Sequence, residues 1–358
     1  FPILLAPIYL IDGINFEAFK LVAIFSLCLV LLLLPKLLSP QLSPNQLLVT
    51  ILIIGANPFV WGYSNEILSD FSFIFFSYLA LFIMRQLHDP ANVSAASYSK
   101  ANRYLLSCML GLIMYLAYGC REIGIILPLC VITYDIVVAR RLSIVAIISI
   151  ALFSILAYLQ HRLLNANFIP EIIQQSLADL AIKNSRSTSI SHLDFVNLNP
   201  SEIISRIQRY RWSMQGFLPF NGQENLEILN SIISHLAMSL AFIGYLISLF
   251  RKITVLEIFF AGYVAVLLLF GAPTYTRYLL PLFPMTIYYL FIAYQTLLNI
   301  TVNKPNYLIT IRSAGYAVLA STAVSYGYAI KTVNYDVVDY GIEHPQSKAM
   351  IAYIRNNT

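Results

Sequence analysis

The sequence predicts an all-α integral membrane protein that crosses the bilayer about ten times. Of the 358 residues, 59% are hydrophobic and 11% are charged, and the mean hydropathy is +0.73. Soluble domains carry about 25% charged residues, so this composition excludes a large soluble core. The charges also leave apolar runs of about 20 residues between them, the length needed to cross roughly 30 Å of hydrocarbon.

The apolar runs divide the chain into two membrane regions. We expect spans near residues 16–35, 46–64, 66–86, 103–120, 122–139, 142–160, 229–250, 253–271, 277–299 and 308–330. The N-terminal membrane region therefore covers residues 1–160 and the C-terminal one covers 229–330. A long segment over 161–228 lies between them, and another segment over 331–358 follows.

The short connections on one side of the membrane contain most of the basic residues. These are Lys36, Arg85, Lys100, Arg103, Arg140, Arg141, Arg251, Lys252, Lys304 and Arg312. The positive-inside rule makes this side cytoplasmic, so that ten spans place both ends of the chain and the 161–228 segment outside.

The outer segment over 161–228 contains two stretches with apolar residues at helical spacing, 169–182 and 200–212. The second begins with Asn-Pro-Ser-Glu, which is typical of a helix start. We expect both helices to lie along the outer membrane face, with Trp212 and Phe217 at the interface. Residues 331–358 are expected to begin an outer soluble portion, and the chain reads as cropped at both ends.

Several function classes lack support in the sequence. The net charge of +5 comes from basic residues scattered over short turns, so no nucleic-acid partner is expected. No Gly-rich phosphate loop, HExxH, CxxC or GxSxG motif occurs. Between Arg277 and Lys304 there is no charged residue, whereas ion-coupled transporters usually hold a charged group at mid-membrane.

Polar residues gather instead in three short outer turns, the first of which contains two carboxylates. Glu66 and Asp70 are four residues apart, which places both on one face of the first turn of a span. Carboxylates at that position also suit the helix dipole, with Ser64 as a cap, so a purely structural role is the alternative.

Arginines occupy the other two turns. Arg121 and Glu122 are adjacent, either as part of a binding site or as a pair that fixes the hairpin. Arg277 stands between Tyr275 and Tyr278 with no acidic residue nearby in the sequence. An arginine beside a bilayer must snorkel to the surface or meet an anion.

Taken together, the three turns predict a site for an anionic ligand anchored in the membrane. The planar fork of arginine suits phosphate oxygens, and partial burial strengthens the contact. A neighbouring carboxylate can remove a proton from an acceptor or bind a divalent cation.

Five short stretches of the chain resemble a known family. They are Phe1-Pro2 with Leu4 to Pro7 (LLAP), Ser64 to Asp70 (SNEILSD), Arg121 to Gly124 (REIG), Arg277 to Pro284 (RYLLPLFP) and Ala352 to Thr358 (AYIRNNT). With the topology, they are similar to the GT-C glycosyltransferases that use polyprenyl-phosphate-linked sugars, of the glycosyltransferase 39 and lipid A aminoarabinose transferase type. RYLLPLFP is the closest match, because it resembles the start of a late span in these enzymes.

The resemblance implies a transferase on the outer face of a bacterial cytoplasmic membrane. Its donor would be a sugar on a polyprenyl phosphate, and its acceptor a lipid, a glycan or a protein. The phosphate would be held by Arg277, Arg121, Tyr275 and Tyr278, while the acceptor or a divalent metal ion would contact Glu66, Asp70 and Glu122. The family's catalytic acid lies in its first outer loop, which we expect upstream of Phe1, and the helices of 169–215 would form a lid.

Two functions of other classes remain as alternatives. A carrier or flippase for lipid-linked oligosaccharides would need basic residues lining a cavity within the bilayer. A non-catalytic membrane scaffold would use the outer turns only as anchors.

Overall fold

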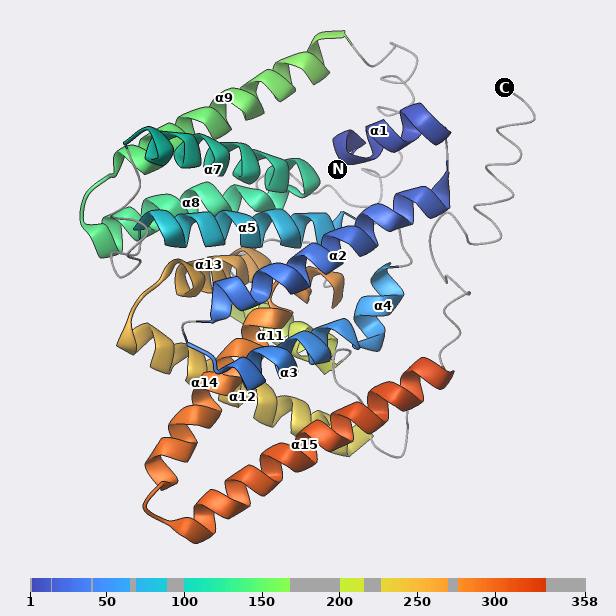
Figure 1. Cartoon of the computed structure of the whole chain (residues 1–358), viewed down its shortest axis with the longest axis vertical. Helices are drawn as coiled ribbons and strands as arrows, with labels where there is room; N and C mark the ends of the chain where they lie inside the picture. The colour runs from blue at the N-terminus through green and yellow to red at the C-terminus, as the bar shows by residue number, and fades with distance from the viewer. Residues whose placement is uncertain are drawn as a thin grey trace. The chain divides into compact units, whose positions relative to one another are not determined.

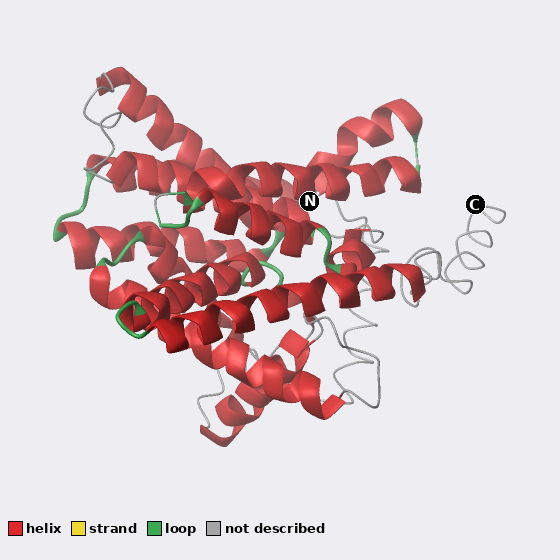
Figure 2. Ribbon diagram, turned by 60° about the horizontal axis from the view of Figure 1, so that its bottom comes forward, coloured by secondary structure: helices red, strands yellow, loops and turns green. Residues whose placement is uncertain are grey.

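The computed structural model describes residues 2–13, 15–39, 41–64, 69–88, 100–167, 200–215, 227–269 and 276–332. Within these ranges every regular element is a helix, as the sequence predicts (Figure 2). Six helical stretches are long and apolar enough to cross a membrane: Glu17–Leu38, Asp70–His88, Ala101–Cys120, Glu122–Ala139, Ile144–Arg162 and Pro305–Lys331. The chain therefore has the helices of a multi-pass membrane protein, with six candidate spans among the described residues where ten were expected.

The expected span over 46–64 is not one helix but two. Helix α3 covers Pro44–Gly55 and helix α4 covers Pro58–Ser64. An unbroken helix is disfavoured at Asn57-Pro58, because proline lacks an N–H and disfavours helical geometry in the preceding residue. Asn57 starts α4 instead, since its side-chain oxygen accepts from the N–H groups of Phe59 (2.9 Å) and Val60 (3.2 Å).

Three later expected spans are also present as helices. Helix α12 (Glu227–Arg251) covers the whole of the span expected over 229–250, and α13 is described over Val255–Leu269. The span expected over 277–299 begins late, since a short 3-10 turn, η4 (Thr276–Leu279), precedes helix α14 (Phe283–Thr301).

The chain divides into two compact units. The first consists of residues 1–75, 211–248 and 279–358, and the second of residues 76–210 and 249–278.

In the first unit, helices α1 (Pro2–Asp12) and α2 (Phe16–Leu38) lead into α3, which packs against both α2 and α14. Helix α15 (Pro305–Thr332) packs against α14 and α4. A buried hydrogen bond fastens α15 to the start of α4: the side-chain amide of Asn57 donates to the hydroxyl of Tyr326 at 2.7 Å. Asn57 is 1% exposed, so this bond satisfies a polar group that would be costly to bury alone.

The second unit contains most of α5 (Asp70–His88), together with α7 (Lys100–Cys120), the 3-10 turn η1 (Glu122–Ile125), α8 (Ile126–Tyr134) and α9 (Ile144–Asn167). Helices α7 and α9 lie side by side (Figure 1). Their backbones approach closely at Gly111, where a Cβ would stand 2.6 Å from the carbonyl oxygen of Ser149. Small residues allow such close contacts between membrane helices.

A buried polar cluster marks the end of α8 in the second unit, where the helix widens into a π-helical turn, η2 (Asp135–Ala139). The Asp135 carboxylate accepts from the backbone N–H and the hydroxyl of Ser143, both at 2.7 Å. Its other oxygen lies 3.1 Å from Nε2 of His88, whose Nδ1 is 2.9 Å from the carbonyl oxygen of Met84. This cluster joins the ends of α5 and α8 to the start of α9.

Candidate functional site

The candidate site lies in the second unit and is centred on Tyr278, a residue of the turn η4. The hydroxyl of Tyr263, from the buried face of α13, donates to the carbonyl oxygen of Tyr278 at 3.1 Å. Tyr263 is fully buried, so the hydrogen bond anchors η4 to a rigid part of the unit.

Two arginines pack against the ring of Tyr278. The guanidinium carbon of Arg121 lies 4.8 Å from the ring centre, and that of Arg277 lies 5.5 Å from it. The separation of the two guanidinium carbons is therefore at most the sum of these two distances. All three side chains are partly buried.

The position of Arg121 depends on a tight turn after α7. Its N–H donates to the carbonyl oxygen of Ala117 (3.0 Å), and its own carbonyl accepts from Gly124 (2.8 Å). A Cβ on Gly124 would stand 2.6 Å from the backbone nitrogen of Tyr118, so the turn can fold back on α7 only with glycine here. Gly124 therefore allows the close approach to α7 on which the position of Arg121 depends.

Two cations on one aromatic ring give this site a positive character. A tyrosine ring attracts a guanidinium group by roughly 0.5–1 kcal/mol at exposed sites, and by more when water is excluded. The ring therefore offsets part of the repulsion between the arginines. Each guanidinium also presents several N–H donors in a plane, an arrangement that matches the oxygens of a phosphate or carboxylate.

Helix α11 (Pro200–Gln215) adds a second arginine–tyrosine pair to the unit. Arg206 is 2% exposed and donates to the carbonyl oxygen of Leu268, in the last turn of α13, at 2.7 Å. It also donates to the Glu202 carboxylate at 2.6 Å. Burial raises the pKa of Tyr210, one turn further along; Arg206 and Arg209 lower it, and Tyr278 raises it further.

The structure brings together three of the residues that the sequence singled out, namely Arg121, Arg277 and Tyr278. Glu122 is exposed at the first position of η1. Asp70 begins α5 and is fully buried in the first unit.

The expectations for several other residues fall outside the described residues. These are Glu66, Tyr275, Phe217, the helix over 169–182, the side chains of Ser64 and Trp212, and residues 333–358. The helix expected over 200–212 is confirmed, since α11 begins at Pro200 as the Asn-Pro-Ser-Glu stretch predicts.

The sequence did not predict the roles of Arg206 and Tyr263 in this region. The spacing of Glu202 and Arg206 at i and i+4 was visible and predicts a pair on one helix face. It gave no sign that this face is buried against α13. Tyr263 looked like any other tyrosine of an apolar span, and only its contact with Tyr278 distinguishes it.

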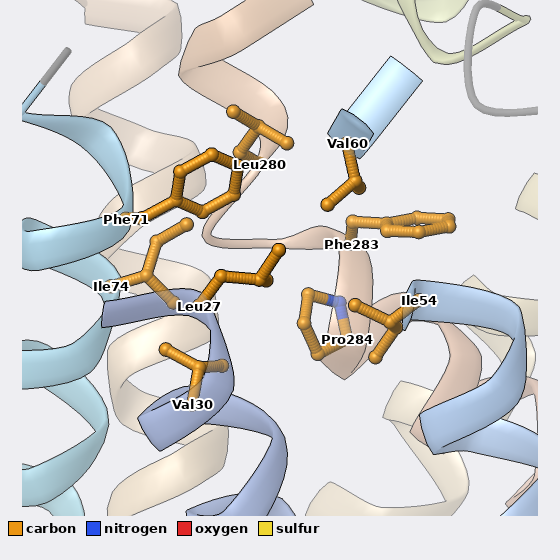
Figure 3. Close-up of a pocket in the computed structure, with 9 residues that line it drawn as sticks. All are labelled: Leu27, Val30, Ile54, Val60, Phe71, Ile74, Leu280, Phe283 and Pro284. Atoms are coloured by element: carbon orange, nitrogen blue, oxygen red, sulfur yellow. The ribbon is translucent and has the colours of Figure 1, made fainter. Parts of the chain in front are cut away.

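The first unit contains a separate feature, a small apolar cavity of about 10 Å³. Side chains from α2, α3, α4, α5 and the start of α14 point toward this space, among them Leu27, Ile54, Phe71 and Phe283 (Figure 3). All of the residues that line it are apolar. A cavity of this size is far smaller than a ligand pocket, so we assign it to the packing of the first unit.

Within the part of the chain that the structure describes, no three His, Cys, Asp or Glu side chains are grouped so that they could hold a metal ion.

Comparisons of the chain with protein-family models, with curated proteins and with solved structures found no match.

Proposed function

We propose that this protein is a membrane glycosyltransferase that takes a sugar from a polyprenyl-phosphate donor. The acceptor is a lipid, a glycan or a protein on the outer face of a bacterial cytoplasmic membrane. The observation that carries the proposal is the meeting of Arg121 and Arg277 on the ring of Tyr278. These two arginines come from the two sequence stretches, REIG and RYLLPLFP, that resemble the GT-C enzymes.

The chemistry of this group suits the phosphate of a lipid-linked sugar. A phosphodiester or phosphomonoester accepts hydrogen bonds through several oxygens, and each guanidinium group presents N–H donors in a planar fork that matches them. Because the group is partly buried, each contact is stronger than it would be in open water. The phosphate is also the leaving group of the transfer, so a cationic site stabilises the charge that develops on it.

The described helices favour this function over a carrier for lipid-linked oligosaccharides. A carrier needs charged or polar groups within the bilayer to pass a sugar headgroup. The buried ionisable groups of the described spans, such as Asp70, Asp135 and Glu257, lie at or near helix ends. Transfer to a hydroxyl acceptor needs a general base.

The proposal is tested by the binding of undecaprenyl phosphate to the purified protein in lipid nanodiscs, with undecaprenol as the uncharged comparison. The wild-type protein is expected to prefer the phosphate. Arg121→Gln and Arg277→Gln are each expected to weaken phosphate binding by about tenfold or more, because a hydrogen bond to a charged group contributes roughly 1.5–3 kcal/mol. Neither variant should change the binding of the alcohol.

A matched control exists in the same unit. Arg162 on α9 also stacks on a tyrosine, Tyr158, at 5.5 Å, but it is exposed and distant in sequence from the outer turns. Arg162→Gln should bind undecaprenyl phosphate as the wild type does. Equal binding of phosphate and alcohol by the wild type would refute the proposed phosphate site.

A further inference from the structure

Helix α11 has an unusual distribution of side chains. Its charged Arg206 and its Tyr210 are buried on one face, whereas Ile204 and Ile207 are more than 45% exposed on another. An arginine is rarely buried without a specific partner, because the loss of its hydration costs several kcal/mol. The hydrogen-bond partners of Arg206 therefore determine which face of α11 is buried.

The guanidinium group of Arg206 donates hydrogen bonds to two acceptors at once. One is the carbonyl oxygen of Leu268 (2.7 Å), which belongs to the last turn of α13 and has no partner within that helix. The other is the carboxylate of Glu202 (2.6 Å), one turn earlier in α11. A cation at this point also suits the negative end of the α13 dipole. The bond to Leu268 ties α11 to the end of α13, and the bond to Glu202 holds the guanidinium group in place on α11.

This placement determines the position of Tyr210. Arg206 and Tyr210 are four residues apart, so they share one face of α11, and Tyr210 is 8% exposed. Helix α13, on whose last turn α11 docks, also holds the turn of Tyr278, because the hydroxyl of Tyr263 on α13 donates to the carbonyl oxygen of Tyr278. Tyr278 carries the ring on which Arg121 and Arg277 pack. A neutral phenol on the docked face of α11 is a hydrogen-bond donor.

We propose that Arg206 is a positioning residue that docks α11 on the end of α13, so that the Tyr210 hydroxyl forms part of the wall of the phosphate site and donates to the bound phosphate. The identity of the ligand in this inference rests on the proposed function, whereas the docking of α11 does not. Arg206 acts through α11 and does not touch the phosphate.

The experiment measures docking and binding separately in the full chain in lipid nanodiscs. Amide hydrogen exchange over residues 200–210, without ligand, reports whether α11 is docked. The affinity for undecaprenyl phosphate, compared with undecaprenol, reports the phosphate site. The variants are Arg206→Gln, Arg206→Lys and Tyr210→Phe, with Arg209→Gln as the control because Arg209 is an exposed arginine on the same helix.

Arg206→Gln is expected to speed exchange over 200–210 and to weaken phosphate binding by about tenfold. Arg206→Lys should restore little of either, since an ammonium group cannot bridge both acceptors as the guanidinium fork does. Tyr210→Phe should leave exchange unchanged and weaken phosphate binding several-fold. Arg209→Gln should match the wild type in exchange.

The inference is overturned if Arg206→Gln keeps wild-type exchange and affinity, or if Tyr210→Phe binds phosphate as tightly as the wild type. Should Arg206→Gln fail to fold, Tyr210→Phe decides, because it leaves both bonds of Arg206 in place. A wild-type protein that does not prefer phosphate over alcohol refutes the proposed function and the role of Tyr210 together. In that case the exchange of Arg206→Gln still decides whether Arg206 docks α11.

Discussion

The guanidinium carbon of Arg121 lies 4.8 Å from the centre of the Tyr278 ring, although the two residues belong to distant turns of the chain. Arg277 packs on the same ring at 5.5 Å. One aromatic side chain therefore holds two cations in a partly buried place, and this arrangement makes the role of the ring itself testable.

Replacing Tyr278 by leucine removes the surface on which both arginines pack. Each cation–π contact contributes roughly 0.5–1 kcal/mol, so the affinity for undecaprenyl phosphate is expected to fall about tenfold. Tyr278→Phe keeps the ring and should retain most of the affinity. Titration of both variants in nanodiscs checks this, and a leucine variant with wild-type affinity would exclude the ring from the site.

The close approach of α7 and α9 predicts that Gly111→Ala destabilises the second unit. The new Cβ would stand 2.6 Å from the Ser149 carbonyl oxygen, and overpacking of this kind costs about 1–3 kcal/mol. Gly119→Ala on the same helix is the control, because its Cβ meets no atom within 4 Å. Thermal unfolding should separate the two variants, with a lower midpoint for Gly111→Ala alone.

The cluster at the end of α8 predicts a loss of stability for Asp135→Ala. The change leaves the partly buried N–H and hydroxyl of Ser143 without their acceptor, at about 1–3 kcal/mol for each unsatisfied group. It also removes the carboxylate oxygen that lies 3.1 Å from Nε2 of His88. Glu17→Ala removes an exposed carboxylate paired with Lys20 and should change stability by less than about 1 kcal/mol. Denaturant unfolding of the two variants compares them directly, and equal stability would contradict the structural role of the cluster.

The hydrogen bond between Asn57 and Tyr326 predicts that Tyr326→Phe loosens α15. The buried amide of Asn57 would lose its acceptor, which costs about 1–3 kcal/mol. Tyr316→Phe on the same helix is the control, because that side chain is 72% exposed. Hydrogen exchange over residues 305–332 should increase in Tyr326→Phe only; similar exchange in both variants would show that the bond does not hold the helix.

The buried position of Tyr210 predicts an alkaline limit for the docking of α11. Burial raises the pKa of this phenol above its ordinary value of 10.0, so the docked form keeps its proton at a pH where the released form loses it. The stabilising contribution is therefore complete below about pH 10 and is lost as the pH rises through the raised pKa. Thermal unfolding followed from pH 8 upward should show a steeper alkaline loss in the wild type than in Tyr210→Phe, and identical curves would contradict this.

The sequence was sufficient for the helical class and for the six candidate spans, because hydropathy and charge spacing report on them directly. It also predicted the start of α11 at Pro200 from a local capping pattern. The break at Asn57-Pro58 was equally visible but was overridden by the apolar run around it. Local signals of this kind deserve more weight than the length of an apolar stretch.

The contacts that make the candidate site were not predictable in the same way. Arg121 and Arg277 were placed in outer turns from the sequence, but their meeting on one ring depends on how α13 packs against α8. The burial of Arg206 depends on a carbonyl oxygen far along the chain, at Leu268. No periodicity or spacing reports such tertiary contacts.

The sparse packing of α15 gives unusual weight to one contact in the first unit. Only 6% of the apolar window of this candidate span is buried by the rest of the described chain, and Ser325 and Tyr326 are its buried residues. The bond between Tyr326 and Asn57 lies at this point and ties the helix to the start of α4. A force that shifts α15 along or across its neighbours therefore reaches α4 through this pair of side chains.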